Sequence, residues 1–199
     1  MKRFYILPLL FLIASYSNNL SSQTTDVTTG IIHVNSLLLN GKDLYFSGYF
    51  EVSKIDITDT NPTRTVVIPS SELTNPWGLT LNGNDLYVAD YTYGDKISKI
   101  DITDTNPTVT DVIIKLQGPS TIAFKGNDLS FGEFRADKIS KINITDTIPT
   151  PTDVITGLDK PSNLVFNGND LYVTSYLEND GKIVKIDVAA TNPVALRMS

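Results

Sequence analysis

The sequence contains no cysteine and only one histidine, and its 16 basic residues are outnumbered by 22 acidic ones. The lack of cysteine excludes disulfides, thiol catalysis and cysteine-ligated zinc. A Ser-His-Asp triad or a two-histidine metal site is disfavoured because His33 is the only imidazole, and we interpret it as a surface residue. The net charge of −6 makes nucleic acid and anionic membranes poor partners.

The sequence also lacks an apolar run long enough to cross a bilayer as a helix. Its one apolar run, from Phe4 to Ala14, follows Lys2 and Arg3 and is about half the length that a membrane span needs. This pattern predicts a signal peptide over residues 1–23, and therefore a secreted, periplasmic or extracellular protein without a transmembrane anchor in the mature chain. The remaining residues 24–199 are interpreted as one folded domain.

What the sequence does have is a repeat. A Gly-x-Asp-Leu motif recurs with its glycine at intervals of 42, 43 and 42 residues, at Gly41, Gly83, Gly126 and Gly168. A Lys-Ile-Asp-Ile motif recurs at similar intervals, beginning at Lys54, Lys99, Lys141 and Lys185. A fixed period of this length is typical of repeat architectures.

Each repeat reads as four short strands joined by turns. In the second copy, Asn82–Asp85 predicts a hairpin turn because Gly and Asn tolerate positive φ. Alternating apolar residues predict strands on either side, at Pro76–Leu81, Leu86–Tyr91, Lys96–Thr103 and Thr108–Ile114. Four antiparallel strands per repeat indicate an all-β fold, a β-propeller of about four blades with approximate bounds 31–70, 76–114, 118–156 and 160–199.

The beginning of the mature chain matches the end of the third repeat. Asp26–Ile31 aligns with Asp153–Leu158 at an offset of 127 residues. We therefore expect residues 25–30 to form an amino-terminal strand that closes the last blade and removes its open edge. Alternatively, residues 193–199 supply a partial outermost strand.

The motif of the second repeat resembles a known group of propellers. Leu86-Tyr87-Val88-Ala89-Asp90-Tyr91, followed by Lys99-Ile100-Asp101, is similar to the repeats of NHL and YWTD propellers in the six-bladed, TolB-like superfamily. The resemblance implies about six blades, whereas only four repeats are present. Three arrangements remain open: a chain truncated relative to a longer propeller, a complete four-bladed ring, and an association of partial rings.

Candidate site residues lie at the end of the second strand of each repeat, where the copies differ. Asp90 and Glu133 occupy positions taken by Gly48 and Ser175 in the other copies. Two carboxylates on neighbouring blades could bind a divalent cation or supply a general base. The alternative is a solvated rim on which Glu133 pairs with Arg135.

Aromatic residues give a second set of candidates. Trp77, the only tryptophan, either lines a ligand funnel or fills the core or the axial channel. An aromatic row recurs one position after the acidic residues and is expected to form core between blades: Tyr49, Tyr91, Phe134 and Tyr176. The Asp-Thr-Asn-Pro loops are interpreted as turns rather than calcium loops.

Together these features favour an exported, non-enzymatic binding or interaction scaffold without a cofactor, for a protein or carbohydrate ligand. Its ligand-binding candidates are Trp77, Asp90, Glu133 and Arg135. The resemblance also allows a metal-dependent lactonase of the gluconolactonase-like type, in which a divalent cation would be held by Asp90, Glu133 and Asn163. A fragment of a longer propeller is the remaining alternative.

Overall fold

The computed structural model describes residues 26–31, 33–92, 94–176, 181–190 and 193, together with the backbone of 196 and 197. The predicted signal peptide over residues 1–23 lies outside the described residues. The strands are β1 (Ser36–Asn40), β2 (Asp43–Gly48), β3 (Glu51–Asp56), β4 (Thr65–Ile68), β5 (Pro76–Asn82), β6 (Asp85–Asp90), β7 (Lys96–Asp101), β8 (Thr110–Ile113), β9 (Pro119–Lys125), β10 (Asp128–Glu133), β11 (Lys138–Asn143), β12 (Thr152–Thr156), β13 (Pro161–Asn167), β14 (Asp170–Ser175), β15 (Lys182–Asp187) and β16 (Leu196–Arg197).

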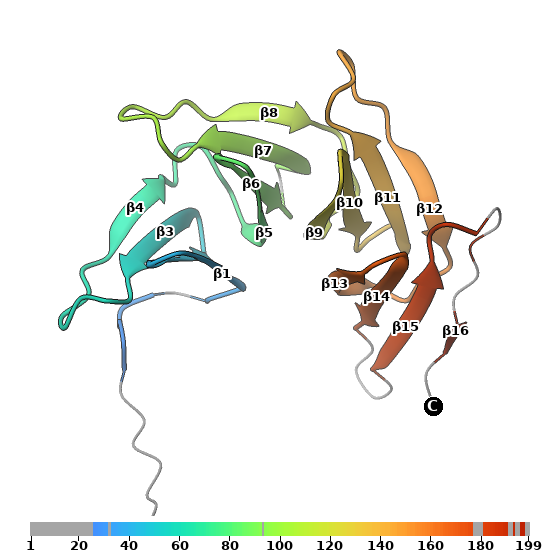
Figure 1. Ribbon diagram of the computed structural model, residues 1–199, viewed down its shortest axis with the longest axis horizontal. Helices are drawn as coiled ribbons and strands as arrows, with labels where there is room; N and C mark the ends of the chain where they lie inside the picture. Colours follow the sequence, from blue (N-terminus) through green and yellow to red (C-terminus); the bar gives the residue numbers. More distant parts are fainter. Residues whose placement is uncertain are drawn as a thin grey trace, which may run out of the picture.

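The strands form four separate antiparallel sheets, each made of four strands in sequence order, from β1-β2-β3-β4 to β13-β14-β15-β16. The sheets follow one another around an arc with β1, β5, β9 and β13 innermost (Figure 1). This is a four-bladed β-propeller arrangement, and the described residues contain no helix. The prediction of an all-β propeller of four-stranded blades is confirmed.

The first hairpin of every blade has the same tight turn. In the second blade, Asn82 pairs with Asp85 across a two-residue loop in which Gly83 has a φ of 61°. A glycine with positive φ at the first central position is typical of a type II′ turn, whose twist matches that of the flanking strands. Gly41, Gly126 and Gly168 have φ values of 60° or 61° in the equivalent turns.

The hydrophobic core lies between successive blades rather than inside any one of them. Val52 of the first blade packs with Leu79 and Leu86 of the second, and Ile97 of the second packs with Ile122 of the third. Ile139 and Leu164 are members of the corresponding cluster between the third and fourth blades. Each blade therefore has one face directed to the preceding blade and one to the following blade.

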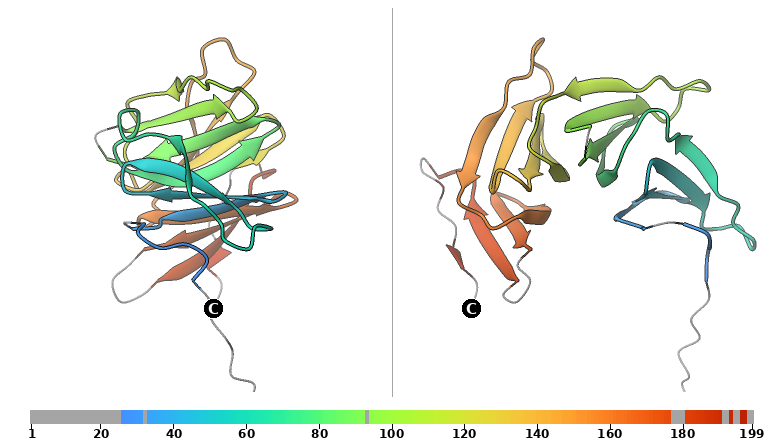
Figure 2. Two further views of the ribbon diagram at one scale, coloured as in Figure 1. Left: turned by 90° about the vertical axis from the view of Figure 1, so that its left-hand side faces the viewer. Right: turned by 180° about the vertical axis from the view of Figure 1, so that it is seen from behind.

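The arc has an open side between its first and last blades. The sheet that begins with β1 and the sheet that begins with β13 face each other across it in Figure 1, and the view from behind in Figure 2 shows the same opening. Of the predicted closing strand at residues 25–30, residue 25 lies outside the described residues, and residues 26–30 lie in no strand. Instead β16 pairs with β15 in the outer position, as the alternative predicted.

Within the described residues, the structure has no helix that is both long and apolar enough to span a membrane.

Candidate functional site: an aromatic rim

Aromatic side chains gather on the rim where the inner strands begin and the second strands end. Pro76 at the start of β5 pairs with Asp90 at the end of β6, so Trp77 and Tyr91 lie next to the same edge of the sheet. We use the name aromatic rim for the residues in this position on the four blades, which are Tyr49, Trp77, Tyr91, Phe134 and Tyr176.

The rings of the middle blades contact one another directly. Trp77 stacks on Tyr91 with ring centroids 4.3 Å apart and an interplanar angle of 10°. Phe134 packs edge-on against both, at 5.9 Å from Trp77 and 5.5 Å from Tyr91. Tyr176 extends the row from Phe134 at 6.2 Å. The aromatic rim therefore connects three blades in one continuous surface.

This arrangement corrects the expectation that the aromatic row is core between blades. Tyr49 is 42% exposed and Tyr176 is 56% exposed, while Tyr91 and Phe134 are only partly buried. The physical reason is position: each residue follows the last residue of a strand, where the chain leaves the pleat and the alternation of inward and outward side chains ends. Trp77 is also half-buried, in contact with the rim rings.

A cation covers part of the aromatic rim. The Arg135 guanidinium lies 5.5 Å from the centre of the Tyr91 ring and donates a hydrogen bond to the Tyr91 carbonyl at 3.3 Å. Its Nη2 is 2.5 Å from Asp95 of the second blade. The expected pairing of Glu133 with Arg135 is therefore wrong, because Arg135 reaches across to the neighbouring blade. Lys160 lies 5.8 Å from the centre of the Phe134 ring.

Asp90 is fully buried and is held by the connection that leads into β5. Its carboxylate accepts hydrogen bonds from the backbone N–H groups of Thr74, at 3.0 Å, and Asn75, at 2.6 Å. The Thr74 hydroxyl donates a further bond at 3.0 Å. These contacts fix the start of the inner strand to the end of the second strand.

Glu133 makes the same kind of contact one repeat later. Its Oε2 accepts a hydrogen bond from the backbone N–H of Gln117 at 2.9 Å, and Oε1 accepts one from the Ser140 hydroxyl at 2.7 Å. The Lys138 ammonium is 3.3 Å from Oε1. Both carboxylates thus accept hydrogen bonds from the connection that leads into the inner strand of their own blade.

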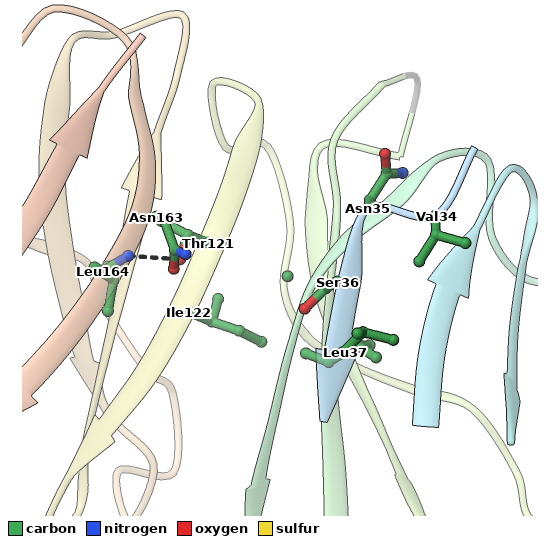
Figure 3. A pocket seen from close by; sticks show the side chains of 10 residues that line it. Val34, Asn35, Ser36, Leu37, Thr121, Ile122, Asn163 and Leu164 are labelled. Atoms are coloured by element: carbon green, nitrogen blue, oxygen red, sulfur yellow. Dashed lines mark hydrogen bonds between the residues drawn. The ribbon is translucent and has the colours of Figure 1, made fainter. Parts of the chain in front are cut away.

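The third proposed metal ligand lies elsewhere. Asn163 is on β13 and lines a cavity of 460 Å³ along the propeller axis, between the inner strands of all four blades (Figure 3). Neither Asp90 nor Glu133 is among the residues that line this cavity. Within the described ranges, no group of three or more His, Cys, Asp or Glu side chains is arranged to hold a metal ion.

The axial cavity is narrow where β5 and β9 approach each other. A Cβ placed on Gly78 would lie 2.9 Å from the Thr121 Cα, so glycine is required for this approach. On the other side of β9, the Thr121 hydroxyl accepts a hydrogen bond from the Leu164 N–H at 3.1 Å, drawn as the dashed line in Figure 3. Two inner strands of the cavity wall, β9 and β13, are therefore joined directly by a hydrogen bond.

In the first three blades, the last residue of the third strand is hydrogen-bonded to the loop that follows it. Asp56 accepts hydrogen bonds from the backbone N–H and the hydroxyl of Thr58 at 2.9 and 2.6 Å, and Asp101 and Asn143 do the same with the threonines two residues later. The hydrogen bond from Lys42, with that from Thr58, lowers the pKa of Asp56 to about 2. In the predicted Asp-Thr-Asn-Pro turn of the second blade, Asp104 accepts a hydrogen bond from the backbone N–H of Asn106 at 3.1 Å, which is an Asx turn.

Sequence reasoning missed the cation–ring contacts between blades. Arg135 follows Tyr91 by 44 residues, which is close to one repeat, whereas Lys160 follows Phe134 by only 26 residues. The repeat itself was the available signal for Arg135, because positions about one period apart lie on adjacent blades.

Comparisons with known proteins show the fold. No family model matches the chain, and no curated protein matches it. Solved structures match the chain. A chain of the nidogen/laminin complex is 19% identical to this chain, with a TM-score of 0.63. The match covers 80% of this chain and 59% of the nidogen/laminin chain. The N-terminal domain of Nup159 is 9% identical with a TM-score of 0.55, covering 83% of this chain. This chain spans 47% of the Nup159 chain. At these identities the likeness establishes the β-propeller fold.

Proposed function

We propose that the protein is an exported, non-enzymatic propeller that binds a protein partner across the aromatic rim. The observation that carries this proposal is the continuous contact of Trp77, Tyr91, Phe134 and Tyr176 on one solvent-facing edge of three blades. Large, rigid aromatic rings are the side chains that contribute most to protein–protein binding, because they bury much area while losing little conformational freedom.

The rim is pre-organised for binding. Trp77 and Tyr91 are stacked, and Arg135 is fixed on Tyr91 by its bonds to Asp95 and to the Tyr91 carbonyl. A surface that is already ordered loses less entropy when a partner binds. The expected partner segment presents apolar or aromatic side chains to the rings, with polar groups around them.

A protein ligand is favoured over a carbohydrate. Sugars also stack on aromatic rings, but the rim joins four rings in one connected row across three blades, which suits an extended protein segment with several anchors. The nidogen/laminin structure, which shares the fold, is a protein complex.

The finer assignment to the NHL or YWTD type is part of this proposal. In the second repeat, the tyrosine of the Leu-Tyr-Val-Ala-Asp motif packs in the core with the Lys99 ammonium 5.8 Å from its ring centre, and the aspartate holds the connection into β5. Both motif residues thus have structural roles in the blade. The motif therefore supports the assignment to the NHL or YWTD type. Because its residues are used inside the blade, we assign binding to the aromatic rim.

Selection of peptides on the immobilised protein tests the proposal, with a glycan array as the second arm. We expect selected peptides rich in aromatic and apolar residues, whose binding changes the fluorescence of Trp77. Tyr91→Ala should weaken that binding at least about tenfold, because one anchor of the surface is removed. Ile148→Ala is the matched control, since Ile148 is 82% exposed in a loop between β11 and β12.

Two outcomes would count against the proposal. Peptides that bind Tyr91→Ala and the unmodified protein equally would show that the rim is not the site. If the rim bound glycans and no peptide, the proposal of a protein partner would be wrong. Export is tested separately by mass spectrometry of the extracellular or periplasmic fraction, where we expect an amino terminus close to residue 24.

A further inference from the structure

The first blade has an apolar face that no other blade covers in the described structure. Leu37 and Leu39 on β1 are 63% and 59% exposed. Leu79 and Ile122, which hold the Leu37 position in the second and third blades, are 8% and 5% exposed because they pack on the preceding blade. We call Leu37 and Leu39 the leading face.

Across β1, β2 and β3, the exposed part of this side of the first sheet is confined to β1, the innermost strand. Phe46 and Ile55, further out on the same side of the first sheet, are each 2% exposed. A partner therefore needs to contact β1, the innermost strand, and the neighbouring Ile57, which is 44% exposed.

The last blade has the opposite face uncovered. Ile183 on β15 is 52% exposed, whereas Val52, Ile97 and Ile139, which hold its position in the other three blades, are fully buried against the next blade. Val165 on β13 is 61% exposed on the same side. We call Val165 and Ile183 the trailing face.

The two faces are the two halves of an interface that the chain already contains three times. Within the chain, Val52 meets Leu79, Ile97 meets Ile122, and Ile139 meets Leu164 in buried clusters. Leu37 is equivalent to the second member of each pair and Ile183 to the first. Any second copy of this chain therefore offers the complementary half of each exposed face.

We propose that a second copy of this chain docks head to tail, with the trailing face of one copy packed on the leading face of the other. The contact repeats the inner-strand part of the blade-to-blade packing across the open side, and it is heterologous, because different faces of the two copies meet. If both pairs of faces engage, two copies close a ring; if one pair engages, the free ends recruit further copies.

The direct test is the mass of the full chain in solution, measured by analytical ultracentrifugation over a range of concentrations. We expect assemblies of two or more chains. Leu37→Glu and Ile183→Glu should each give a monomer. In either variant, every head-to-tail contact would bury a carboxylate on one of its two faces, which is unfavourable. Ile148→Glu, at an exposed site far from both faces in the sequence, is the control and should assemble like the unmodified chain.

Mixing the two variants gives a sharper test. The Leu37→Glu chain retains an intact trailing face, and the Ile183→Glu chain retains an intact leading face. The mixture should therefore form a 1:1 complex that stops at two chains, which only a heterologous contact predicts. Both substitutions are at exposed positions, and circular dichroism of each variant alone verifies that it is folded.

Several results would overturn the proposal. One is a monomer at all concentrations up to about 100 μM, where even a weak contact would be populated. Another is assembly that survives both substitutions, which would place the contact elsewhere, for example at the apolar run of residues 4–14. A mixture of folded variants that stays monomeric would also exclude the head-to-tail arrangement.

Discussion

The indole of Trp77 lies parallel to the ring of Tyr91, with their centroids 4.3 Å apart. One residue belongs to an innermost strand and the other follows the adjacent strand, so the pair joins the beginning of β5 to the end of β6. Because Trp77 is the only tryptophan, its fluorescence reports on this rim and on no other part of the protein.

Removing the Tyr91 ring should expose the indole. We expect Tyr91→Ala to shift the emission of Trp77 to longer wavelength and to lower the free energy of unfolding by about 1–2 kcal/mol, since a stacked pair and its buried area are lost. Tyr49→Ala is the control, because Tyr49 contacts His33 and Phe50 instead. An unchanged spectrum in folded Tyr91→Ala would contradict the stacked geometry.

The Asp90 carboxylate should contribute strongly to stability. In Asp90→Ala the partly buried N–H groups of Thr74 and Asn75 lose their acceptor, and we expect the free energy of unfolding to fall by about 1–3 kcal/mol. Asp90→Asn, which keeps one acceptor oxygen, should cost about half as much. Urea unfolding followed by circular dichroism measures both. A loss below about 0.5 kcal/mol in Asp90→Ala would show that these hydrogen bonds are unimportant.

A side chain at Gly78 should separate the second and third blades. Gly78→Ala places a Cβ 2.9 Å from the backbone of Thr121, and relief requires β5 or β9 to move. We expect a loss of about 1–3 kcal/mol in the free energy of unfolding. Gly181→Ala is the matched control, because the nearest atom to its Cβ is at an ordinary 3.8 Å. Equal thermal midpoints for the two variants would refute the close approach.

Stability should decline at low pH. Hydrogen bonds from Lys42 and then Thr58 lower the pKa of Asp56 to about 2, and the Thr103 hydroxyl lowers the pKa of Asp101. A carboxyl whose pKa is lower in the folded state stabilises the protein above its unfolded pKa of about 3.9, and this contribution is lost as pH falls toward 2. We expect the urea midpoint to be lower at pH 2.5 than at pH 5.

The opposite sign applies at high pH. The hydrogen bond from Lys99 to Asp85 raises the pKa of Lys99, so its contribution to stability is present below about pH 10.4 and is lost as pH rises through the raised value.

At low pH, the variant Asp56→Asn isolates the contribution of one carboxyl group, since Asn143 makes the same turn in the third blade. This variant should show a smaller drop between pH 5 and pH 2.5; an unchanged drop would exclude Asp56 as a contributor.

Much of the fold could be predicted from the sequence because each hairpin has its own local signal. The turn predicted at Asn82–Asp85 is present in the structure. The predicted strand Lys96–Thr103 contains the observed strand β7, Lys96–Asp101. The outer strand was harder: Thr108–Ile114 was expected and only Thr110–Ile113 pairs, because an edge strand has one bonded neighbour and weak alternation.

The strand positions of the candidate residues could be predicted, but their contacts could not. Asp90 and Glu133 are the last residues of β6 and β10, and Trp77 is near the start of β5, because the hairpin turns fix these strand ends. The roles were not predicted: the repetition of Tyr91 in other copies suggested core, although repetition also arises when a surface recurs on every blade. The Arg135–Asp95 pair depends on how two blades are oriented, which strand periodicity does not encode.

The apolar core of the contact between two blades does not depend on where a blade stands in the series, because equivalent positions meet at all three boundaries. A tandem duplication of one repeat in the gene would therefore add a blade that already fits both of its neighbours, and an in-frame deletion of one would leave the remaining joints compatible. Recombination that duplicates or deletes one repeat could therefore change the number of blades without compensating mutations in the apolar contacts.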